Sequence, residues 1–410
     1  MDFLTGTMIG TITLFLDMTP YWLPVALGFI FWKLWIHYIQ AKHIAKIEWI
    51  VLEVRLPRDV FKPPLAMELV LNALYQTGGA ATWVDRIWLG KVRTWFSLEM
   101  VSLGGTLRFF IRAPKFFKNL VESQIYAQYA QAEVNEVPDY TDHISFDDTL
   151  GKKPEWSMWG CEFKLSKPDP YPIKTYVDYG LDRGDKEEYK VDPLTSTMEL
   201  LGSIGPDEQL WIQILVQATK KRFDKPGTWT GKRDWKDEGV DLIAKLREDA
   251  KKKGSVGDEE GTTFTAMTKG EMNVISAIER SVSKLGFDCG VRGIYLAKKE
   301  VFNAINIVGL VGAFKQYGSA DLNGFRPSWV TSFDYPWEDF RGIRASKKRI
   351  KMLSAYKMRS FFYPPFKRKP FVLNTEELAT IYHFPGGVAE TPSFARIESK
   401  KTEPPVNLPI

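Results

Sequence analysis

The sequence predicts an α+β protein that starts with a transmembrane helix, continues through two α/β units and ends in a basic segment. Three observations support this prediction. Residues 11–39 are almost entirely apolar. From residue 49 onward, strand-like and helix-like hydrophobic periods alternate. Residues 341–370 hold 11 lysines and arginines and no acidic residue.

The composition suits a chain that folds and buries a core. Of its 410 residues, 44% are hydrophobic and 26% are charged, close to ordinary globular values. The two cysteines, Cys161 and Cys289, lie far apart and form neither a CxxC pair nor a disulfide framework. This cysteine usage is typical of a reducing compartment.

The apolar run at 11–39 is longer than the roughly 20 residues that cross a bilayer. No lysine or arginine precedes it, whereas Lys33, Lys42 and Lys46 lie in its last part or follow it. The positive-inside rule therefore predicts a single-pass protein of the cell (inner) membrane, with its N-terminus outside and its bulk in the cytoplasm. Aromatic residues suited to an interfacial belt are Trp22, Trp32, Trp35 and Tyr38.

The anchor and juxtamembrane helix occupy residues 1–46, and the first soluble unit follows at 47–137. This unit reads as a strand at 49–57, a helix after Pro63-Pro64, two strands around Gly104-Gly105, a helix from Lys115 and a short closing strand. The order β-α-β-β-α-β is that of ferredoxin-like domains.

A polar stretch at 138–158 reads as a linker to a second α/β domain at 159–340, also expected to be a ferredoxin-like sandwich. Two strands are expected within 161–180, a helix capped by Asp192, and a buried strand at 208–219. Thr268 and Glu271 form the pattern of a capping box at the start of another helix, before a strand at 287–299. Between them, 220–262 reads as a charged excursion with one helix at about 235–253.

Sequence motifs for catalysis are weak. The loop "PGTWTGKRDW" at 226–235 has three residues between its glycines, where a phosphate-binding loop needs four, and Arg233 follows the lysine. The four histidines lack metal-ligand spacing, and no GxSxG elbow is present. We therefore expect a protein that is not an enzyme and needs no cofactor or metal.

The basic segment suits a polyanion. Its cations are interleaved with aromatic residues, so inner-leaflet phosphates, DNA or an acidic protein are all candidate partners, and a plain solvated helix is the alternative. The cations assigned to polyanion binding are Lys347, Lys348, Arg349, Lys351, Arg359, Lys367, Arg368 and Lys369.

After the basic segment, "FVLNTEELATIYHFPG" at 371–386 reads as a strand followed by a short helix. Thr375 is the expected N-cap, and Glu376 and Glu377 lie at the positive end of the helix. Leu378 is expected to face inward, and Pro385-Gly386 ends the helix. The residues that follow are Pro-rich and are expected to be extended.

Several long stretches resemble a membrane-anchored family of unassigned function from candidate-phyla bacteria. They include "RDVFKPPLAMELVLNALYQTGG", "LGSIGPDEQLWIQILVQ" and "KPFVLNTEELATIYHFPG", and the resemblance runs from about residue 48 to 410. The chain is similar to the N-terminal region that precedes type IV secretion or conjugation ATPases of the FtsK–HerA superfamily.

The resemblance implies a scaffold subunit of a type IV secretion-like or DNA-translocating machine that docks a separate P-loop ATPase at the cytoplasmic face. Around a ring-shaped motor, copies would form a homo-oligomer. The partner-binding residues would be Thr375, Glu376, Glu377, Leu378, His383, Phe384 and Pro385.

Docking is one of three hypotheses for this segment. In the second, the chain is a piece of a longer protein that continues into the motor domain. In the third, the segment packs on its own domain. For the whole protein, the alternative function is that of a membrane-tethered nucleic-acid-binding protein that uses residues 341–370.

Overall fold

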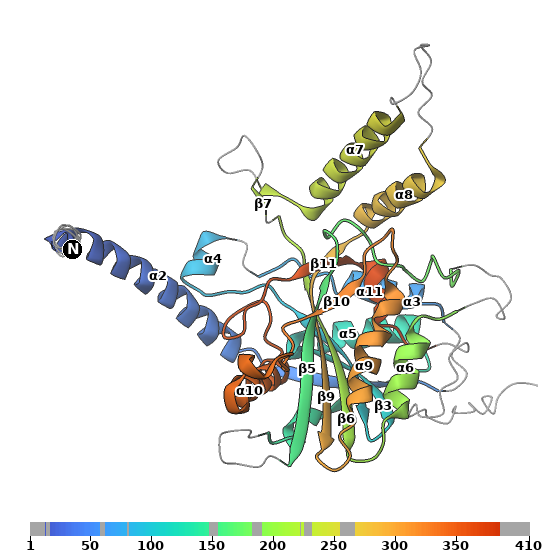
Figure 1. Ribbon diagram of the computed structural model, residues 1–410, viewed down its shortest axis with the longest axis horizontal. Helices are drawn as coiled ribbons and strands as arrows, with labels where there is room; N and C mark the ends of the chain where they lie inside the picture. The colour runs from blue at the N-terminus through green and yellow to red at the C-terminus, as the bar shows by residue number, and fades with distance from the viewer. Residues whose placement is uncertain are drawn as a thin grey trace, which may run out of the picture. The chain divides into compact units, whose positions relative to one another are not determined.

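The computed structural model describes residues 13, 17–57, 62–79, 82–146, 155–182, 191–221, 223–224, 232–254 and 267–385. The chain divides into two compact units. The first comprises residues 1–48 and 78–93, and the second comprises residues 49–77 and 94–410. Figure 1 shows the described elements along the chain.

The first unit is built on helix α2 (Thr19–Ala45), which agrees with the predicted apolar helix. It is the one helix in the described part of the chain that is long and apolar enough to cross a membrane. The short helix α4 (Trp83–Ile87) packs beside it, because the Trp35 indole donates to the Ile87 carbonyl at 3.1 Å. A Cβ on Gly90 would lie 2.3 Å from the Ile39 carbonyl oxygen, so this close approach requires glycine.

The second unit is organised by a nine-stranded antiparallel sheet, in the order β10-β5-β9-β6-β2-β3-β1-β4, with β11 also paired to β9. The N-terminal half of the unit contributes β1 (Trp49–Arg55), β2 (Phe96–Leu103), β3 (Thr106–Pro114) and β4 (Glu133–Val137). The remaining strands are β5 (Trp156–Leu165), β6 (Glu208–Ala218), β9 (Gly286–Lys298), β10 (Phe325–Ser328) and β11 (Phe371–Asn374).

The two halves of this sheet have the same internal order. In the N-terminal half, β1 lies between β3 and β4, and β2 lies beyond β3. In the other half, β5 lies between β9 and β10, and β6 lies beyond β9. The halves join where β2 pairs with β6, in a register that runs from Phe96 opposite Val216 to Leu103 opposite Gln209. The stretches predicted as separate α/β domains therefore share one continuous sheet.

Helices from both halves cover one face of the sheet (Figure 1). Their apolar side chains form one core with the inward residues of the strands, because each helix turns an apolar stripe toward the sheet. These helices are α3 (Leu65–Ala73), α5 (Lys118–Gln128), α6 (Leu194–Ser203), α9 (Ala304–Ala313) and α11 (Thr375–Ile381). Of the described residues, more are buried in the core on this face than in the core on the opposite face.

The opposite face is covered by α10 (Ile343–Lys357) and by the 3-10 turn η2 (Tyr140–His143). Met352, Leu353 and Tyr356 of α10 pack on Trp211 and on neighbouring apolar residues of the strands. The predicted linker at 138–158 thus contributes Tyr140 to a core rather than only spanning two domains.

Helices α7 (Trp235–Gly254) and α8 (Lys269–Ser283) form a hairpin between β6 and β9. Ile243, Ile275 and Ile278 are its buried contacts. The charged helix expected at about 235–253 is confirmed, as is the capping box of Thr268 and Glu271. The short strands β7 (Phe223–Asp224) and β8 (Lys232–Arg233) pair at the base of the excursion.

Several local predictions were wrong. Only one strand, β5, forms in the region where two were expected, because Pro168, Pro170 and Pro172 turn the chain after Leu165. The cap of α11 is Asn374 rather than Thr375, and it forms a capping box with Glu377.

Candidate functional site

The segment predicted to dock a partner is part of the core. Strand β11 pairs with β9, and α11 packs against α3. All seven residues assigned to partner binding are buried: Thr375, Glu376, Glu377, Leu378, His383, Phe384 and Pro385. The hypothesis that this segment packs on its own domain is confirmed for 371–385, and these side chains cannot reach a partner in this fold. The tail from Gly386 onward lies outside the described residues.

Glu376 is held by two cations of helix α8 and its end. Its carboxylate lies 3.3 Å from Arg280 Nε and 2.9 Å from Lys284 Nζ. The Thr175 hydroxyl donates to the same carboxylate at 2.5 Å. Lys284 also pairs with Glu68 of α3 at 2.7 Å, so α3, α8 and α11 are joined by one charged cluster.

Among the described residues, no cation pairs with Glu377. Its two carboxylate oxygens accept from the backbone N–H groups of Asn374 and Ile173, each at 2.8 Å. Burial raises the pKa of Glu377 to about 8, although these two hydrogen bonds favour the charged form. This carboxyl therefore stabilises the local backbone while it retains a proton at neutral pH.

His383 links the end of the segment to the start of α6. Its Nε2 lies 3.0 Å from Asp192 Oδ2, while Asp192 Oδ1 accepts from the backbone N–H of Leu194 at 2.8 Å. Burial acts to lower the pKa of His383, but the Asp192 carboxylate outweighs it and raises that pKa above 6.5. The N-cap of α6 is Pro193 rather than the predicted Asp192, but the Asp192 carboxylate still joins the backbone at the start of α6 to a buried histidine.

The basic segment is divided between surface and interior. Lys347 and Lys351 on α10 and Lys367 and Lys369 after it are exposed, whereas Lys348, Arg349 and Arg368 are half-buried. Arg359 is fully buried and is not available to a polyanion. The prediction of a polyanion site is therefore wrong for Arg359.

Arg359 is instead the centre of an ion-pair network on the α10 face. Its guanidinium makes two parallel bonds to Glu99, Nε to Oε1 at 2.9 Å and Nη2 to Oε2 at 3.0 Å, and it also pairs with Asp139. Burial opposes ionisation of Glu99, but Arg359 outweighs it and holds the pKa of Glu99 below its usual value. Such a bidentate pair fixes geometry as well as charge.

Glu99 belongs to a polar row that crosses four strands at one level. Glu162 lies opposite Arg292, Arg292 opposite Gln213, and Gln213 opposite Glu99. The row binds the last turn of α10 and the chain after it, because Arg292 donates to the carbonyls of Ala355 and Ser360 at 3.1 and 2.8 Å. The row is therefore a clamp for the basic segment.

Sequence reasoning missed this row. A usable signal existed for two members, since Gln213 in "LWIQILV" and Arg292 in "CGVRGIYL" are single polar residues in otherwise apolar stretches. A polar side chain in a central strand must find a buried partner. The sequence does not say that the partner lies in the segment after α10.

The aromatic residues of the basic segment do not form a stacking surface. Tyr356, Phe361 and Phe362 are buried. Half-buried Trp329, from a neighbouring loop, has Arg368 Cζ 3.8 Å and Lys351 Nζ 6.0 Å from its ring centroid. The arginine thus covers a ring that a nucleotide base would need for stacking.

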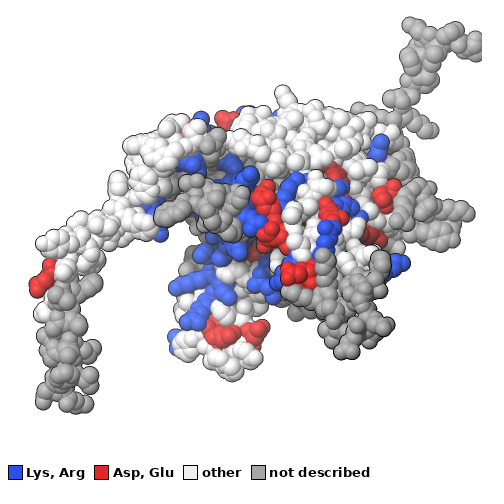
Figure 2. Space-filling view, turned by 90° about the horizontal axis from the view of Figure 1, so that it is seen from above, with Lys and Arg blue, Asp and Glu red and all other residues white. Residues whose placement is uncertain are grey.

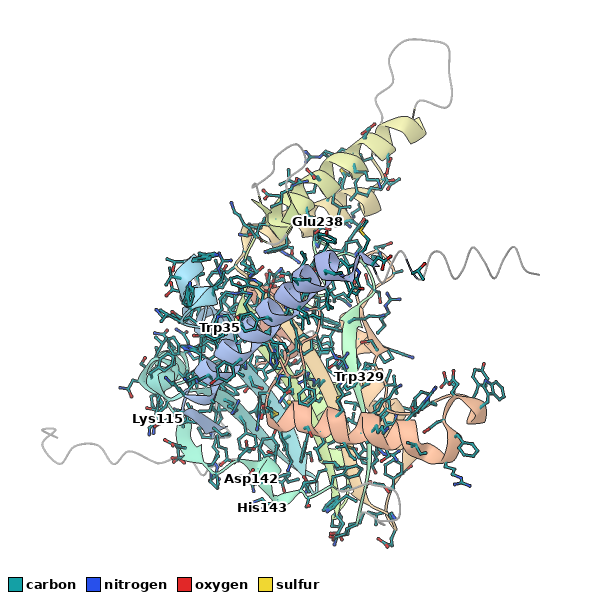
Figure 3. All side chains as sticks on the ribbon, turned by 90° about the vertical axis from the view of Figure 1, so that its left-hand side faces the viewer. Trp35, Lys115, Asp142, His143, Glu238 and Trp329 are labelled. Carbon is teal, nitrogen blue, oxygen red and sulfur yellow. The ribbon has the colours of Figure 1, made fainter. Side chains whose placement is uncertain are left out.

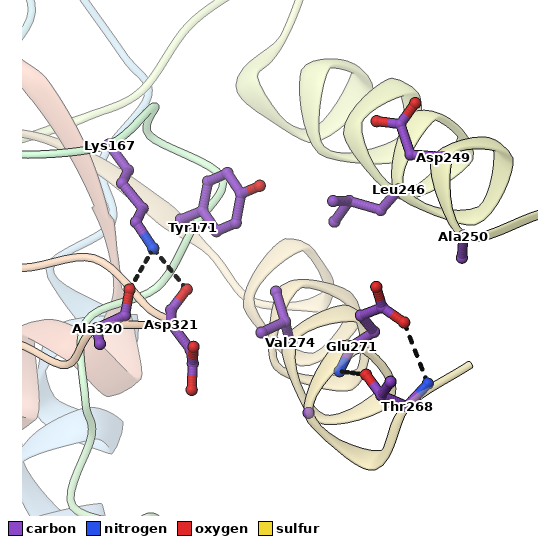
Figure 4. A pocket seen from close by; sticks show the side chains of 11 residues that line it. Lys167, Tyr171, Leu246, Asp249, Ala250, Thr268, Glu271, Val274, Ala320 and Asp321 are labelled. Atoms are coloured by element: carbon purple, nitrogen blue, oxygen red, sulfur yellow. Dashed lines mark hydrogen bonds between the residues drawn. The ribbon is translucent and has the colours of Figure 1, made fainter. Parts of the chain in front are cut away.

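A cavity of about 650 Å³ lies between the α7–α8 hairpin and the loops at Lys167 and Asp321 (Figure 4). Two of its charged side chains, Lys167 and Glu271, already have structural partners. Lys167 Nζ donates to the carbonyls of Ala320 and Asp321, and Glu271 is engaged in the capping box. Within the described ranges, no group of three or more His, Cys, Asp or Glu side chains is placed to hold a metal ion.

A family model described as a domain of unknown function (DUF8128) matches residues 44–396. No curated protein matches the chain. The matched region covers the whole nine-stranded sheet together with α10 and α11, and it makes up most of the 410 residues. The protein therefore belongs to the DUF8128 family.

Proposed function

We propose that the protein is a membrane-anchored, non-enzymatic scaffold subunit of a type IV secretion-like or DNA-translocating machine. Helix α2 anchors it as a single pass in the cell membrane, with the N-terminus outside and the sheet unit in the cytoplasm. The observation that carries the proposal is α2 itself, which has 27 residues and leaves most of its large apolar side chains exposed.

We infer that the sheet unit consists of two ferredoxin-like halves. Support comes from the strand order, in which each half repeats the arrangement of a split βαβ unit, with two helices on the same face. The scaffold role is supported by the buried polar groups, because Arg359, Arg292 and Glu376 are used to join segments of the chain. These groups stabilise the fold and leave its outer surfaces for partners.

The partner of this scaffold is a P-loop ATPase that binds in trans. Its docking surface lies outside the buried α11 segment, so charge reversal of Glu376 and Glu377 would report unfolding rather than docking. The test is purification of the full chain from native membranes followed by mass spectrometry. Stoichiometric recovery of a P-loop ATPase supports the proposal, and its consistent absence after crosslinking contradicts it.

Anchoring is tested separately. Retention of the full chain in membranes at alkaline pH supports a spanning α2, and release into the supernatant contradicts it. Protease added to sealed, inside-out vesicles should degrade the sheet unit if this unit is cytoplasmic.

A second candidate function is nucleic-acid binding by the basic segment. Four exposed lysines favour it: Lys347, Lys351, Lys367 and Lys369. Affinity for a DNA duplex or single strand should then fall steeply with salt. Absence of binding at low salt would exclude this candidate.

A further inference from the structure

The loop before α10 displays three large aromatic side chains to solvent. Tyr335, Trp337 and Phe340 are 53%, 78% and 73% exposed. Tyr335 and Trp337 stack face to face, with ring centroids 4.7 Å apart and planes 10° apart. Neither the core contacts nor the proposed scaffold role accounts for this much exposed aromatic surface.

The loop has a defined shape that presents these rings. Arg341 and Gly342 both have positive φ, 58° and 73°, and reverse the chain into α10. The Asp339 carboxylate then accepts from the backbone N–H groups of Arg344 and Ala345 at 2.7 and 2.9 Å. The loop is thereby fixed to the first turn of α10.

Helix α10 carries this loop away from the sheet. Its C-terminal half holds the buried residues Met352, Leu353 and Tyr356, whereas its N-terminal half buries only Ala345. Figure 3 shows α10 running out from the sheet beyond Trp329. The aromatic loop lies at the outer end of that helix.

Exposed cations lie in the loop and along α10, next to the aromatic side chains in sequence. Arg341, Arg344, Lys347 and Lys351 are exposed, and the Arg341 guanidinium lies 5.2 Å from the centroid of the Phe340 ring. Figure 2 shows lysine and arginine side chains along the projecting lobe and acidic side chains near its end. Of the nearby acids, Asp339 caps the helix and Glu338 is half-buried, whereas Asp334 is exposed beside Tyr335.

Aromatic rings next to long cationic side chains are the chemistry of a bilayer interface. Tryptophan and tyrosine settle at the headgroup level, and lysine and arginine reach the lipid phosphates. Each cation near an anionic surface adds about 1 kcal/mol. We infer that residues 335–341 and the exposed cations of α10 form a second, interfacial contact with an anionic bilayer.

Two observations favour a bilayer over a nucleic acid. The rings of Tyr335 and Trp337 are stacked on each other, and Arg341 lies over Phe340, so the ring faces that bases need are partly used. The inference rests on the proposed anchoring in one respect. A chain held by α2 makes the second contact intramolecular and thus effective at low intrinsic affinity.

The experiment places a polarity-sensitive fluorophore on the full chain through Trp337→Cys. The native Cys161 and Cys289 are buried and so should not be labelled in the folded protein. We expect blue-shifted emission, and quenching by nitroxide-bearing lipid, in vesicles with about one third anionic lipid, and much weaker signals in zwitterionic vesicles. The matched control is Phe116→Cys, an exposed aromatic position elsewhere that should report water in both.

Charge variants sharpen the test. Lys347→Gln with Lys351→Gln should reduce binding of the labelled loop to anionic vesicles about fivefold per lysine. The exposed pair Lys245→Gln with Lys299→Gln is the control and should leave binding unchanged.

Several outcomes would overturn the inference. A label that reports water in anionic vesicles, while alkaline extraction still leaves the chain in the membrane, removes the interfacial contact but keeps the anchor. A label that responds to a single-stranded oligonucleotide and not to lipid replaces the bilayer by a nucleic acid. A chain that is extracted at alkaline pH, yet has a lipid-quenched label, retains the contact and contradicts the anchor.

Discussion

The α10 and α11 segments both carry charged side chains, yet they use them in opposite ways. Around α10, Lys347 and Lys351 point to solvent four residues apart, whereas Glu376 and Glu377 of α11 are buried. From the sequence, both segments are predicted to bind partners. Only α10 keeps an outer face that a partner can reach.

The difference lies in where the partners of each charge come from. Glu376 meets Arg280 and Lys284, about 90 residues earlier, and Arg359 meets Glu99, 260 residues earlier. A buried charge is tolerated because such distant groups pair with it and complete its hydrogen bonds. Local composition does not show which distant groups pair with a charge. The charge of a segment therefore did not tell whether its side chains are exposed or buried.

The largest effect should come from Arg359→Ala. The change leaves Glu99 buried without its cation, and we expect the free energy of unfolding to fall by about 3–5 kcal/mol. Chemical denaturation of the full chain, followed by near-ultraviolet circular dichroism, measures it. Lys351→Ala on the exposed side of α10 is the control and should change little; a loss below about 1 kcal/mol in Arg359→Ala would contradict the clamp.

Leu378→Ala should come next. Leu378 is fully buried in the main core, so its truncation should cost about 2–5 kcal/mol. Leu69→Ala, an exposed leucine of α3, is the matched control and should cost far less. Equal and small losses in both variants would mean that α11 does not pack as described.

A smaller effect should appear as a pH dependence. Glu377 and His383 both have pKa values raised in the folded state, so the folded chain binds more protons than the unfolded chain. Stability should therefore fall as pH rises, by a few kcal/mol in total, from about pH 4.5 to about pH 8 for Glu377 and above about pH 6.5 for His383. Glu99 and Asp192 have lowered pKa values, so their contribution to stability is lost only at lower, acidic pH.

The measurement is the unfolding midpoint at pH 5, 6.5 and 8. Glu377→Gln should lower stability at each pH, because its amide nitrogen cannot accept from a backbone N–H, but it should flatten the slope. An unchanged slope in this variant would assign the pH dependence to other groups.

The smallest effect on stability is expected for Lys347→Gln with Lys351→Gln. Both side chains are exposed, so the free energy of unfolding should change by less than about 0.5 kcal/mol. Binding to anionic vesicles should nevertheless weaken. A loss of stability comparable to that of Leu378→Ala would show that the outer face of α10 is not free.

Much of the fold follows from local patterns. The strands before and after Gly104-Gly105 were predicted, and both glycines have the positive φ that a tight turn requires. The capping box of α8 was visible as Thr268 and Glu271. These features depend on residues close in sequence, which is why sequence reasoning reaches them.

The rest depends on contacts between distant residues. Nothing in "FSLEMVSL" states that β2 pairs with β6, since the pairing joins strand edges more than 100 residues apart. For the candidate site, the exposed lysines of α10 were identified, whereas the burial of Arg359 and of α11 was not. A short polar helix reads as a surface helix until its partners are known.

The clamp across the sheet and the burial of α11 also set the order in which the chain can mature. The start of strand β9 is paired with β11 only after β11 has been synthesised. Helix α3 is synthesised early and lacks its packing partner α11 until then. During synthesis, the apolar surface of α3 lacks its partner until α11 has left the ribosome, whereas Glu99 needs only Arg359 and Glu162 only Arg292. Because loop closure over such separations is slow, nascent chains of this family should depend on chaperones, and chains truncated before β11 should be degraded.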